Sequence, residues 1–382
     1  MNSFKERLLV DAKTRSIHLN NAGVGPLMKP AFDKIQHLTD QHSEVGSFAI
    51  MEEAFKIEEY RSIFATFLGT SVDNVSFMSS CSSALSQVAL SYKLQAGDII
   101  LGSDQEYPSN AYPWLEAANK YGAEYIQIKA DPSNHELCTT KVLEALQDDR
   151  VNVLALSWVQ FQNGSTINID LISKECQKRE ILFVLDGIQA LGVLPFDFDK
   201  SGVDAICGGS HKWLGAPVGL GFLLTKPELR KKLYPRDHGA LNHLEFNEPF
   251  QRDKAAREDG RRFEPGALNL SAIAAVSENL KVLEAIGQKV LYQHSFDLSK
   301  YLYEGLKDMG AHVFRVEGWN SIRSPILTFK MDKIESSILE EELKMNCISC
   351  TPRLGGLRLA PHIVNDKSDI EAVLNIILKC MN

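Results

Sequence analysis

Lys212 and Asp186 are the residues whose types and surroundings most clearly suit covalent chemistry. Asp186 closes the apolar run Ile181–Asp186, and Lys212 follows on a later segment that reads Ser-His-Lys-Trp. A free lysine amine is mostly protonated near neutral pH, so it becomes a nucleophile only where its surroundings help it. An amine that can bond to an aldehyde, with a carboxylate that can hold a ring nitrogen protonated, predicts pyridoxal phosphate chemistry.

Both residues have simpler interpretations when taken alone. Asp186 begins an Asp-Gly pair, a common turn dipeptide, and Lys212 could be an ordinary surface lysine. Gln189 follows in the same stretch, and glycines around Lys212 suit a close approach of backbone, which favours the chemical interpretation. Ser210 and His211 could donate hydrogen bonds to a phosphate or a ring, although His211 could equally be a packed core residue.

A cluster of serines around Cys81, residues 79–83, follows a predicted strand and opens a predicted helix. Backbone N–H groups and hydroxyls at a helix N-terminus suit a phosphate dianion. Ordinary N-capping explains one serine well, but it explains a cluster less well. We therefore expect Cys81 and Ser82 to lie in a phosphate-binding turn.

Polar and aromatic residues elsewhere could complete a binding site. Tyr107 follows a predicted strand and could stack on a heteroaromatic ring, although a loop tyrosine is more often a packing residue. Asn21 lies in a polar turn near the N-terminus. Arg353 and Arg358 could each hold a carboxylate in two hydrogen bonds, and a surface salt bridge is an equal alternative for Arg353.

Short apolar runs alternate with longer amphipathic runs through the middle of the chain, which predicts crossover units and a mostly parallel sheet. The strand closest after Lys212 is expected to be antiparallel to its neighbours. The predicted strands are Val75–Met78, Ile99–Gly102, Tyr125–Ile128, Val153–Ser157, Leu182–Asp186, Ala205–Cys207 and Gly219–Leu224. The predicted helices are Ser83–Lys93, Pro113–Lys120, Thr140–Gln147, Leu171–Glu180, Pro227–Lys232 and Ser271–Leu291.

The domain organisation follows from the same pattern. A charged run, Asn247–Arg262, is expected to form a surface loop or linker. We predict an N-terminal arm (residues 1–20) that belongs to the small domain, a large domain that binds the cofactor (21–255), and a smaller α+β C-terminal domain (256–382).

Composition limits the classes of function. The chain has 382 residues, a net charge of −8, 44% hydrophobic and 24% charged residues, which is typical of a globular enzyme. The negative charge and the pI near 5.7 disfavour nucleic acid and anionic membranes as partners. Because no long apolar segment is present, a cytoplasmic location is expected.

Seven dispersed cysteines favour free thiols over a disulfide framework. Cys347 and Cys350 form a single Cys-x-x-Cys pair without nearby histidines, which is a weak zinc signal, and two packed thiols are the favoured interpretation. No metal site is therefore predicted.

Together these segments resemble the class V aminotransferases, a family of fold-type I pyridoxal phosphate enzymes that includes isopenicillin N epimerase-like proteins and cysteine desulfurases. The resemblance rests on the Asp-Gly-x-Gln-Ala and Ser-His-Lys-Trp segments and covers nearly the whole chain. It implies a doubly wound, seven-stranded sheet, pyridoxal 5'-phosphate as cofactor, an amino acid substrate and a homodimer.

The resemblance also implies roles for individual residues. Lys212 would form the Schiff base, Asp186 would pair with the pyridine nitrogen, and Gln189 would contact the ring hydroxyl. Tyr107 falls at the ring-stacking position and Arg358 at the position that binds the substrate carboxylate. The remaining implied contacts are the phosphate-binding residues Cys81, Ser82 and Ser210 or His211, the substrate-binding residues Asn21 and Arg353, and Gly266, which would reach the cofactor of the neighbouring subunit.

Three departures from the family pattern bear on the reaction. The loop after Arg353 is short and has no cysteine, which makes a persulfide mechanism doubtful. Cys81 and Ala267 stand where hydroxyl donors are common, and Phe161 stands where many relatives have a polar side chain. The sequence therefore predicts an aminotransferase or epimerase-like enzyme, with a cysteine or selenocysteine lyase or desulfurase, or a non-catalytic protein that binds the cofactor, as alternatives.

Overall fold

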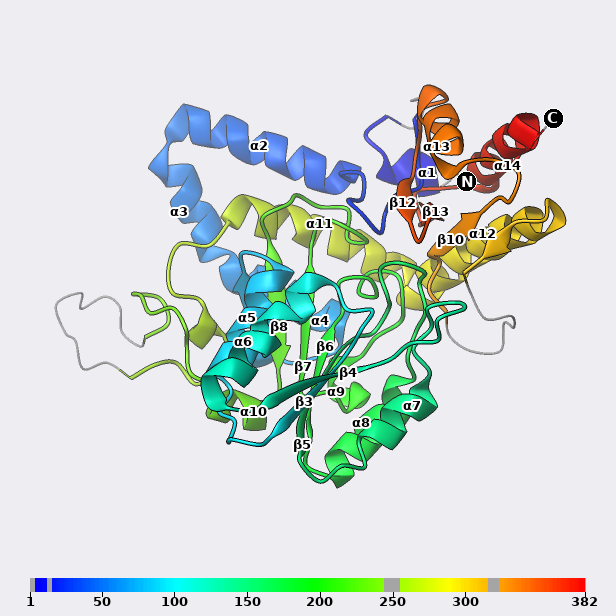
Figure 1. Cartoon of the computed structure of the whole chain (residues 1–382). Coiled ribbons are helices and arrows are strands. Elements are labelled where there is room, and N and C mark those ends of the chain that lie inside the picture. Colours follow the sequence, from blue (N-terminus) through cyan, green and yellow to red (C-terminus); the bar gives the residue numbers. More distant parts are fainter. Residues whose placement is uncertain (1–3, 12–15, 244–254, 315–322, 382) are drawn as a thin grey trace.

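A computed structural model describes residues 4–11, 16–243, 255–314 and 323–381. Its centre is a seven-stranded sheet with the order β2-β8-β7-β6-β5-β3-β4 (Figure 1). β8 runs antiparallel to both β2 and β7, and the other neighbouring pairs are parallel. The predicted seven-stranded, mostly parallel sheet and the antiparallel strand after Lys212 are both confirmed.

The strands of the central sheet are β2 (Val75–Met78), β3 (Ile99–Ser103), β4 (Glu124–Ile128), β5 (Val151–Ser157), β6 (Leu182–Asp186), β7 (Ala205–Gly209) and β8 (Gly221–Thr225). The α-helices of this part of the chain are α2 (Lys29–Val45), α3 (Ser47–Phe55), α4 (Ile57–Leu68), α5 (Cys81–Ser91), α6 (Tyr112–Tyr121), α7 (Thr139–Ala145), α8 (Ile169–Lys178), α9 (Phe198–Ser201), α10 (Pro227–Lys232) and α11 (Leu270–Ile286). All of the strands predicted from the sequence are present, and their bounds differ by no more than two residues.

Local sequence explains why these elements form where they do. β6 is apolar up to its last residue and is buried along its whole length, as expected for a central parallel strand covered on both faces. α8 begins where the Asn168 side chain accepts a hydrogen bond from the Leu171 amide. α5 begins with a capping box, in which Ser80 and Ser83 each satisfy the other's backbone amide.

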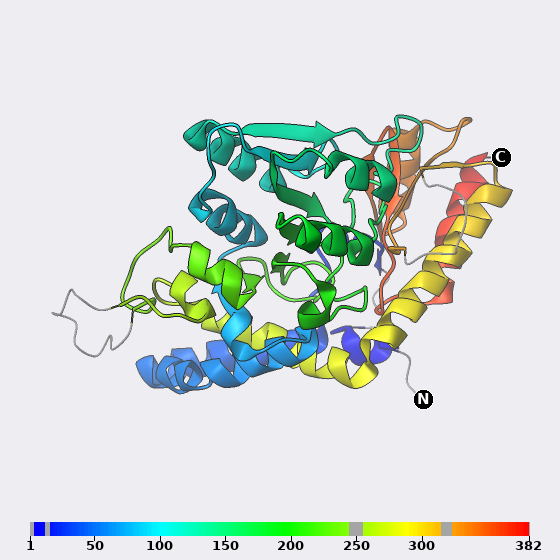
Figure 2. The same ribbon diagram turned by 90° about the horizontal axis from the view of Figure 1, so that it is seen from below.

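A second, four-stranded sheet lies beside the first, with the order β12-β13-β10-β9. Its own hydrophobic core includes Leu19 near the N-terminus and residues between Leu298 and Ile377. Its elements are α12 (Gln288–Asp308), β9 (His312–Val313), β10 (Leu327–Lys330), α13 (Ser336–Met345), β12 (Thr351–Arg353), β13 (Gly356–Leu359) and α14 (Lys367–Met381). Figure 2 shows α12 and α14 packed side by side in this part of the molecule.

The N-terminal segment joins this second core. It contains α1 (Phe4–Leu8) and β1 (Ile17–His18), and β1 pairs in parallel with β11 (Ile348–Ser349). The predicted domain boundaries at residues 20 and 255 stay predictions. α11 packs against α2 and α4 and lies in the core of the large sheet, and residues 247–254 of the predicted linker lie outside the described residues.

The predicted single helix Ser271–Leu291 is wrong. The structure has two helices there, α11 and α12, with Gly287 between them at a φ of 91°. A positive φ is costly for residues with a Cβ and ends a helix readily at glycine. The continuous apolar pattern concealed this break, because both helices bury one face.

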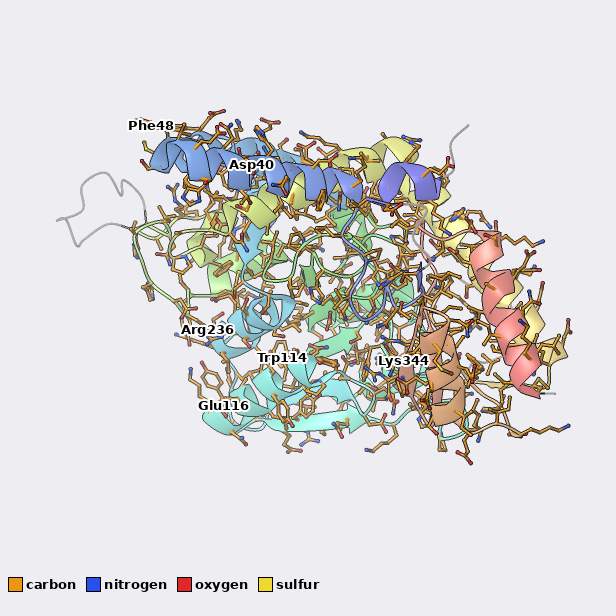
Figure 3. The ribbon with its side chains drawn as sticks, turned by 90° about the horizontal axis from the view of Figure 1, so that it is seen from above. Asp40, Phe48, Trp114, Glu116, Arg236 and Lys344 are labelled. Atoms are coloured by element: carbon orange, nitrogen blue, oxygen red, sulfur yellow. The ribbon has the colours of Figure 1, made fainter. Side chains whose placement is uncertain are left out.

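The long helices α2 and α3 extend along one side of the molecule, and α3 carries apolar side chains that are exposed to solvent. Phe48 and Phe55 are 78% and 82% exposed, and Figure 3 shows Phe48 at the outer end of these helices. Within the described residues, no helix is both long and apolar enough to cross a membrane. The cytoplasmic location stays a prediction.

A buried ion pair attaches the segment before α11 to the central sheet. Arg61 on α4 donates two hydrogen bonds to the Glu264 carboxylate, at 2.7 and 2.9 Å. Glu264 also accepts from the Phe77 amide on β2, and Arg61 donates to the Val75 carbonyl. Both side chains are almost fully buried, and the other carboxylate near Arg61, that of Glu58 at 3.3 Å, is half-exposed, so Glu264 is the main partner of the Arg61 charge.

Glu264→Ala should lower the free energy of unfolding by about 3 kcal/mol, because it leaves the buried Arg61 charge with the half-exposed Glu58 as its remaining carboxylate contact. Urea unfolding monitored by circular dichroism measures this loss. Arg150→Ala is the matched control: it breaks exposed pairs with Glu124 and Asp148 and should cost less than about 1 kcal/mol. Equal effects of the two changes would contradict the role of the buried pair.

Candidate active site

A cavity of about 320 Å³ opens where β5 and β6 end. This is the end of a parallel sheet at which ligands bind in doubly wound folds. Its walls come from the large sheet, from the turn near Gly23 and from the β12–β13 hairpin. The lining residues are Ala22, Gly23, Ser80, Cys81, Ser82, Tyr107, Ser109, Ser157, Val159, Phe161, Asp186, Ile188, Gln189, His211, Lys212, Arg353 and Arg358.

Asp186 lies at the end of β6 and is 4% exposed. Its Oδ1 accepts hydrogen bonds from the Ile188 amide at 2.9 Å and from the Cys81 thiol at 3.5 Å. Burial raises the pKa of this carboxyl group, while the Ile188 amide and the positive charge of Lys212 oppose the rise. A cationic ring nitrogen nearby would act in the same direction as Lys212 and favour the ionised carboxylate.

The Lys212 amine lies in the same cavity and differs from a surface lysine. Burial, with a smaller contribution from the neighbouring positive charge of Arg358, lowers its pKa from the ordinary value to about 8. Asp186 opposes this by stabilising the ammonium form. At pH 8 a substantial fraction of the amine is therefore neutral and nucleophilic, as addition to an aldehyde requires.

The loop that carries Lys212 is fixed from several directions. The Trp213 indole donates to the Gln189 side-chain oxygen at 3.0 Å, and Gln189 in turn donates to the Ala22 carbonyl. On the N-terminal side, Gly25 donates its amide to the His211 carbonyl at 2.7 Å. A Cβ at Gly25 would lie 2.1 Å from the Lys212 carbonyl oxygen, so only glycine fits this close approach.

His362 supports the same loop from the C-terminal part of the chain. It is fully buried, its Nε2 lies 2.9 Å from the Trp213 carbonyl oxygen, and its ring meets the Trp213 ring edge-on. Because a carbonyl can only accept, Nε2 carries the hydrogen, and Nδ1 faces the Ser295 hydroxyl at 3.3 Å. Burial lowers the pKa of His362 to about 3, so it is neutral at physiological pH.

The serine cluster has a capping role and a cavity-facing role. The Ser80 and Ser83 hydroxyls accept backbone hydrogen bonds in the capping box. The Ser82 hydroxyl instead donates to the Ser109 hydroxyl at 2.7 Å. Cys81 is buried, and burial together with Asp186 raises the pKa of its thiol well above the ordinary value. The thiol is therefore not activated, and what the N-terminus of α5 offers an anion is mainly backbone N–H groups and the Ser82 hydroxyl.

Arg358 projects into the cavity from β13 and is 2% exposed. It donates to the Phe161 carbonyl and to the Asn20 side-chain oxygen, the second at 3.2 Å. Its Nε is buried without a hydrogen-bond partner. Burial lowers the pKa of Arg358 to about 9, and the nearby Arg353 charge contributes to the shift. A buried guanidinium with an unused donor is suited to binding a carboxylate.

Arg353 also lines the cavity, so the structure does not support the alternative that it forms a surface salt bridge. Its guanidinium lies 5.6 Å from the Phe161 ring centroid and donates to the Pro352 carbonyl. Within the described part of the chain, no carboxylate lies within ion-pair distance of it. Tyr107 meets the same Phe161 ring edge-on at 5.2 Å and is 49% exposed, at the mouth of the cavity.

Several predicted site residues do not line this cavity. The Ser210 hydroxyl donates to the Pro217 carbonyl at 2.6 Å, so His211, not Ser210, reaches the cavity wall. Asn21 is fully buried behind Ala22 and donates to the Ala360 carbonyl. Gly266 lines a separate cavity of about 360 Å³, together with Ser79 and Ser83.

Three supporting residues were not identified from the sequence. Asn20 accepts hydrogen bonds from both Arg358 and Thr351, and His362 supports Trp213. Glu106 holds the end of β5: it accepts from the Ser157 amide and hydroxyl at 2.9 and 2.6 Å, and burial raises its pKa to about 7. Two of them left a signal: Asn20 belongs to the polar turn that contains Asn21, and Glu106 directly precedes Tyr107 in the loop after β3.

The other cysteines do not form a site. Cys347 is exposed, Cys350 is half-buried, and both are free thiols. Burial raises the pKa of Cys350 to about 11. Among the residues that the structure describes, no cluster of three or more histidine, cysteine or acidic side chains could hold a metal ion.

The cavity residues fit pyridoxal phosphate. One cavity is surrounded by an unactivated thiol, a buried carboxylate, a lysine with a lowered pKa and guanidinium groups with unused donors. Asp186 and Lys212 are the residues that can meet the ring nitrogen and the aldehyde, and the N-terminus of α5 can meet the phosphate. Gln189 keeps one amide N–H beyond its bond to Ala22, so its contact with the ring hydroxyl stays a prediction.

Comparison with known proteins identifies the class. Residues 17–373 match the model of the family described as Aminotransferase class-V, and the chain belongs to this family. The match confirms the predicted family and its cofactor, pyridoxal phosphate. It also confirms the fold-type I architecture, with a smaller C-terminal part after the central sheet.

Individual relatives differ in activity. The chain is 24% identical to the uncharacterized aminotransferase YcbU of Bacillus subtilis, over 84% of this chain and 82% of the relative. It is 28% identical to isopenicillin N epimerase of Streptomyces clavuligerus, over 60% of this chain and 58% of that protein. The apo structure of a cysteine desulfurase from Thermococcus onnurineus NA1 has a TM-score of 0.85 and 20% identity, over 96% of this chain and 94% of that chain.

The rate at which Lys212 captures free pyridoxal phosphate should rise with pH through about 8 and then level off, because only the neutral amine reacts. Stopped-flow absorbance of the protein without cofactor measures this midpoint. Asp186→Asn should move the midpoint to lower pH, because it removes a negative charge that stabilises the ammonium form. Arg358→Gln should move the midpoint to higher pH, because it removes a positive charge that disfavours the ammonium form. A rate still climbing at pH 10 in the unmodified protein would contradict the lowered pKa.

His362 should make stability depend on pH. Its pKa is lower in the folded chain than in the unfolded chain, so the unfolded state binds more protons between about pH 6.5 and 3. Over that window its contribution should be lost as pH falls, by up to about 1.4 kcal/mol per pH unit. Urea unfolding measures the free energy of unfolding of the unmodified protein and of His362→Gln. The difference between the two free energies should be smaller at pH 5 than at pH 7, and a difference that does not change with pH would exclude this role.

Proposed function

We propose that this chain is a pyridoxal phosphate enzyme that acts at the Cα–H bond of an amino acid, as an aminotransferase or an epimerase-like enzyme. The observation that carries the proposal is the pairing of Lys212 with Asp186 in one buried cavity that also contains Arg358. When bound, the cofactor supplies a ring that stabilises negative charge at the substrate Cα.

The residues of the chain have separate tasks in this proposal. Asp186 holds the ring nitrogen in its protonated form by hydrogen bonding and charge. Arg358 binds the α-carboxylate with the guanidinium that lines the cavity and so orients the Cα–H bond. The Lys212 amine, with a pKa of about 8, is suited to take a proton from Cα and to return it near neutral pH.

The proposal extends to a homodimer. Gly266 lies in the cavity formed with Ser79, Ser83 and Phe263, next to the N-terminus of α5 but outside the active-site cavity of its own chain. The exposed apolar side chains of α3, Phe48 and Phe55, offer a surface for a second copy. The segment around Gly266 would then reach the cofactor of the neighbouring subunit.

A cysteine desulfurase or lyase is the second candidate, supported by the fold shared with a cysteine desulfurase. The cavity argues against a persulfide mechanism. The turn between β12 and β13 contains Leu354 and Gly355 and no cysteine. Among the described lining residues the one thiol is Cys81, whose raised pKa disfavours the thiolate.

Exchange of the Cα hydrogen in deuterated water tests the proposal. With a panel of amino acids, the holoprotein should exchange the Cα hydrogen of its substrates, and Lys212→Ala should slow exchange by about 10²–10⁴-fold, because it removes the acid–base group. Nuclear magnetic resonance measures the exchange. Lys178→Ala, at an exposed lysine on α8, is the control and should leave the rate unchanged.

The same panel separates the alternatives. Sulfide release from cysteine without Cα exchange in other amino acids would favour the lyase. A protein that binds the cofactor, becomes linked to it at Lys212 after borohydride reduction, and leaves every amino acid unchanged would favour the non-catalytic alternative. Borohydride labelling of another lysine would contradict the site itself.

A further inference from the structure

Two guanidinium groups face the active-site cavity from one β-hairpin. Arg353 on β12 pairs with Gly356, and Arg358 on β13 pairs with Thr351. Because side chains alternate along a strand, Arg353 and Arg358 lie on the same face as diagonal neighbours, roughly 7–8 Å apart at their backbones. Both side chains line the cavity that contains Lys212.

Both arginines contact neutral acceptors. Arg358 donates to a carbonyl and to the Asn20 amide oxygen, and Arg353 donates to the Pro352 carbonyl. The Nε of each is buried without a hydrogen-bond partner. Over the described ranges of the chain, neither has a carboxylate within ion-pair distance. Two positive charges therefore lack a counter-ion at this end of the cavity.

Bound pyridoxal phosphate would leave these two charges available. Its phosphate would lie at the N-terminus of α5 and its ring nitrogen would face Asp186. Figure 1 shows α5 on one side of β6 and the β12–β13 hairpin on the other side. A substrate α-carboxylate neutralises one arginine, and the second arginine keeps a positive charge at the cavity wall that can bind a second anion.

We infer that the substrate is an amino acid with a second carboxylate on its side chain. Arg358, the more deeply buried arginine, binds the α-carboxylate, and Arg353 binds the side-chain carboxylate. The Phe161 ring lies against the Arg353 guanidinium, and Tyr107 packs edge-on against that ring, so the specificity-determining arginine has an aromatic support. This inference rests on the proposed function and adds a substrate class to it.

Binding of acids that lack an amine tests the inference without turnover. Glutarate and its monoamide have nearly the same shape and differ by one carboxylate. Titration calorimetry with the holoprotein should give glutarate at least about tenfold tighter binding than the monoamide, because a charge-assisted pair with Arg353 exists for glutarate alone. Equal affinities would overturn the inference.

Variants assign the effect to Arg353. Arg353→Gln should weaken glutarate to the affinity of the monoamide and leave the monoamide unchanged. Arg353→Lys should retain part of the preference, since it keeps the charge and loses the planar fork. Arg358→Gln should weaken both acids, and Arg150→Gln, at an exposed arginine, should change neither.

Two outcomes with Arg353→Gln would contradict the assignment. An equal loss for both acids, or a loss of the bound cofactor's absorbance, would mean that Arg353 serves the cofactor or the fold. Arg353→Lys then repeats the comparison in a protein that keeps the charge. Failure of the proposed function has a different signature, since the holoprotein would then exchange the Cα hydrogen of no amino acid in the panel, whichever acid binds.

Discussion

The chemistry of this site depends on the removal of the Lys212 amine from water. A buried ammonium loses hydration, so burial shifts the equilibrium toward the neutral amine, and the nearby Arg358 adds to the shift. Asp186 limits it by offering a negative charge in the same cavity. The balance gives a pKa of about 8, which suits the role of nucleophile and proton carrier that we propose for Lys212 near neutral pH.

That balance requires the lysine loop to stay in place, and most of its support comes from distant parts of the chain. His362 hydrogen bonds to the Trp213 carbonyl, and Gly25 approaches the Lys212 backbone closely. Arg358 is held by Asn20 from the N-terminal segment. The second core contains Leu19, Leu357 and Leu359, and so positions Asn20 and Arg358. Trp213 and Ile363, the neighbour of His362, belong to the core of the large sheet, which therefore supports the lysine loop.

Much of the fold could be predicted because the strands of a covered parallel sheet are continuous apolar runs. β6 and β2 have the bounds expected from the sequence. The break at Gly287 could not be predicted from periodicity, because α11 and α12 both bury an apolar face. The buried pair Arg61–Glu264 was equally hidden, since its members are far apart in the sequence and each resembles a surface charge.

The sequence by itself determined the central sheet, the family and its cofactor, and it singled out Lys212 and Asp186 as candidates, because a lysine and a carboxylate placed after buried strands carry a local signal. Only the tertiary structure decided which polar residues share one cavity. It placed Arg353 and Arg358 on one face of a hairpin, and it turned Ser210 toward the Pro217 carbonyl. It also buried His362 against Trp213. The physical reason is that desolvation and hydrogen bonding depend on neighbours in space, and sequence spacing does not record them.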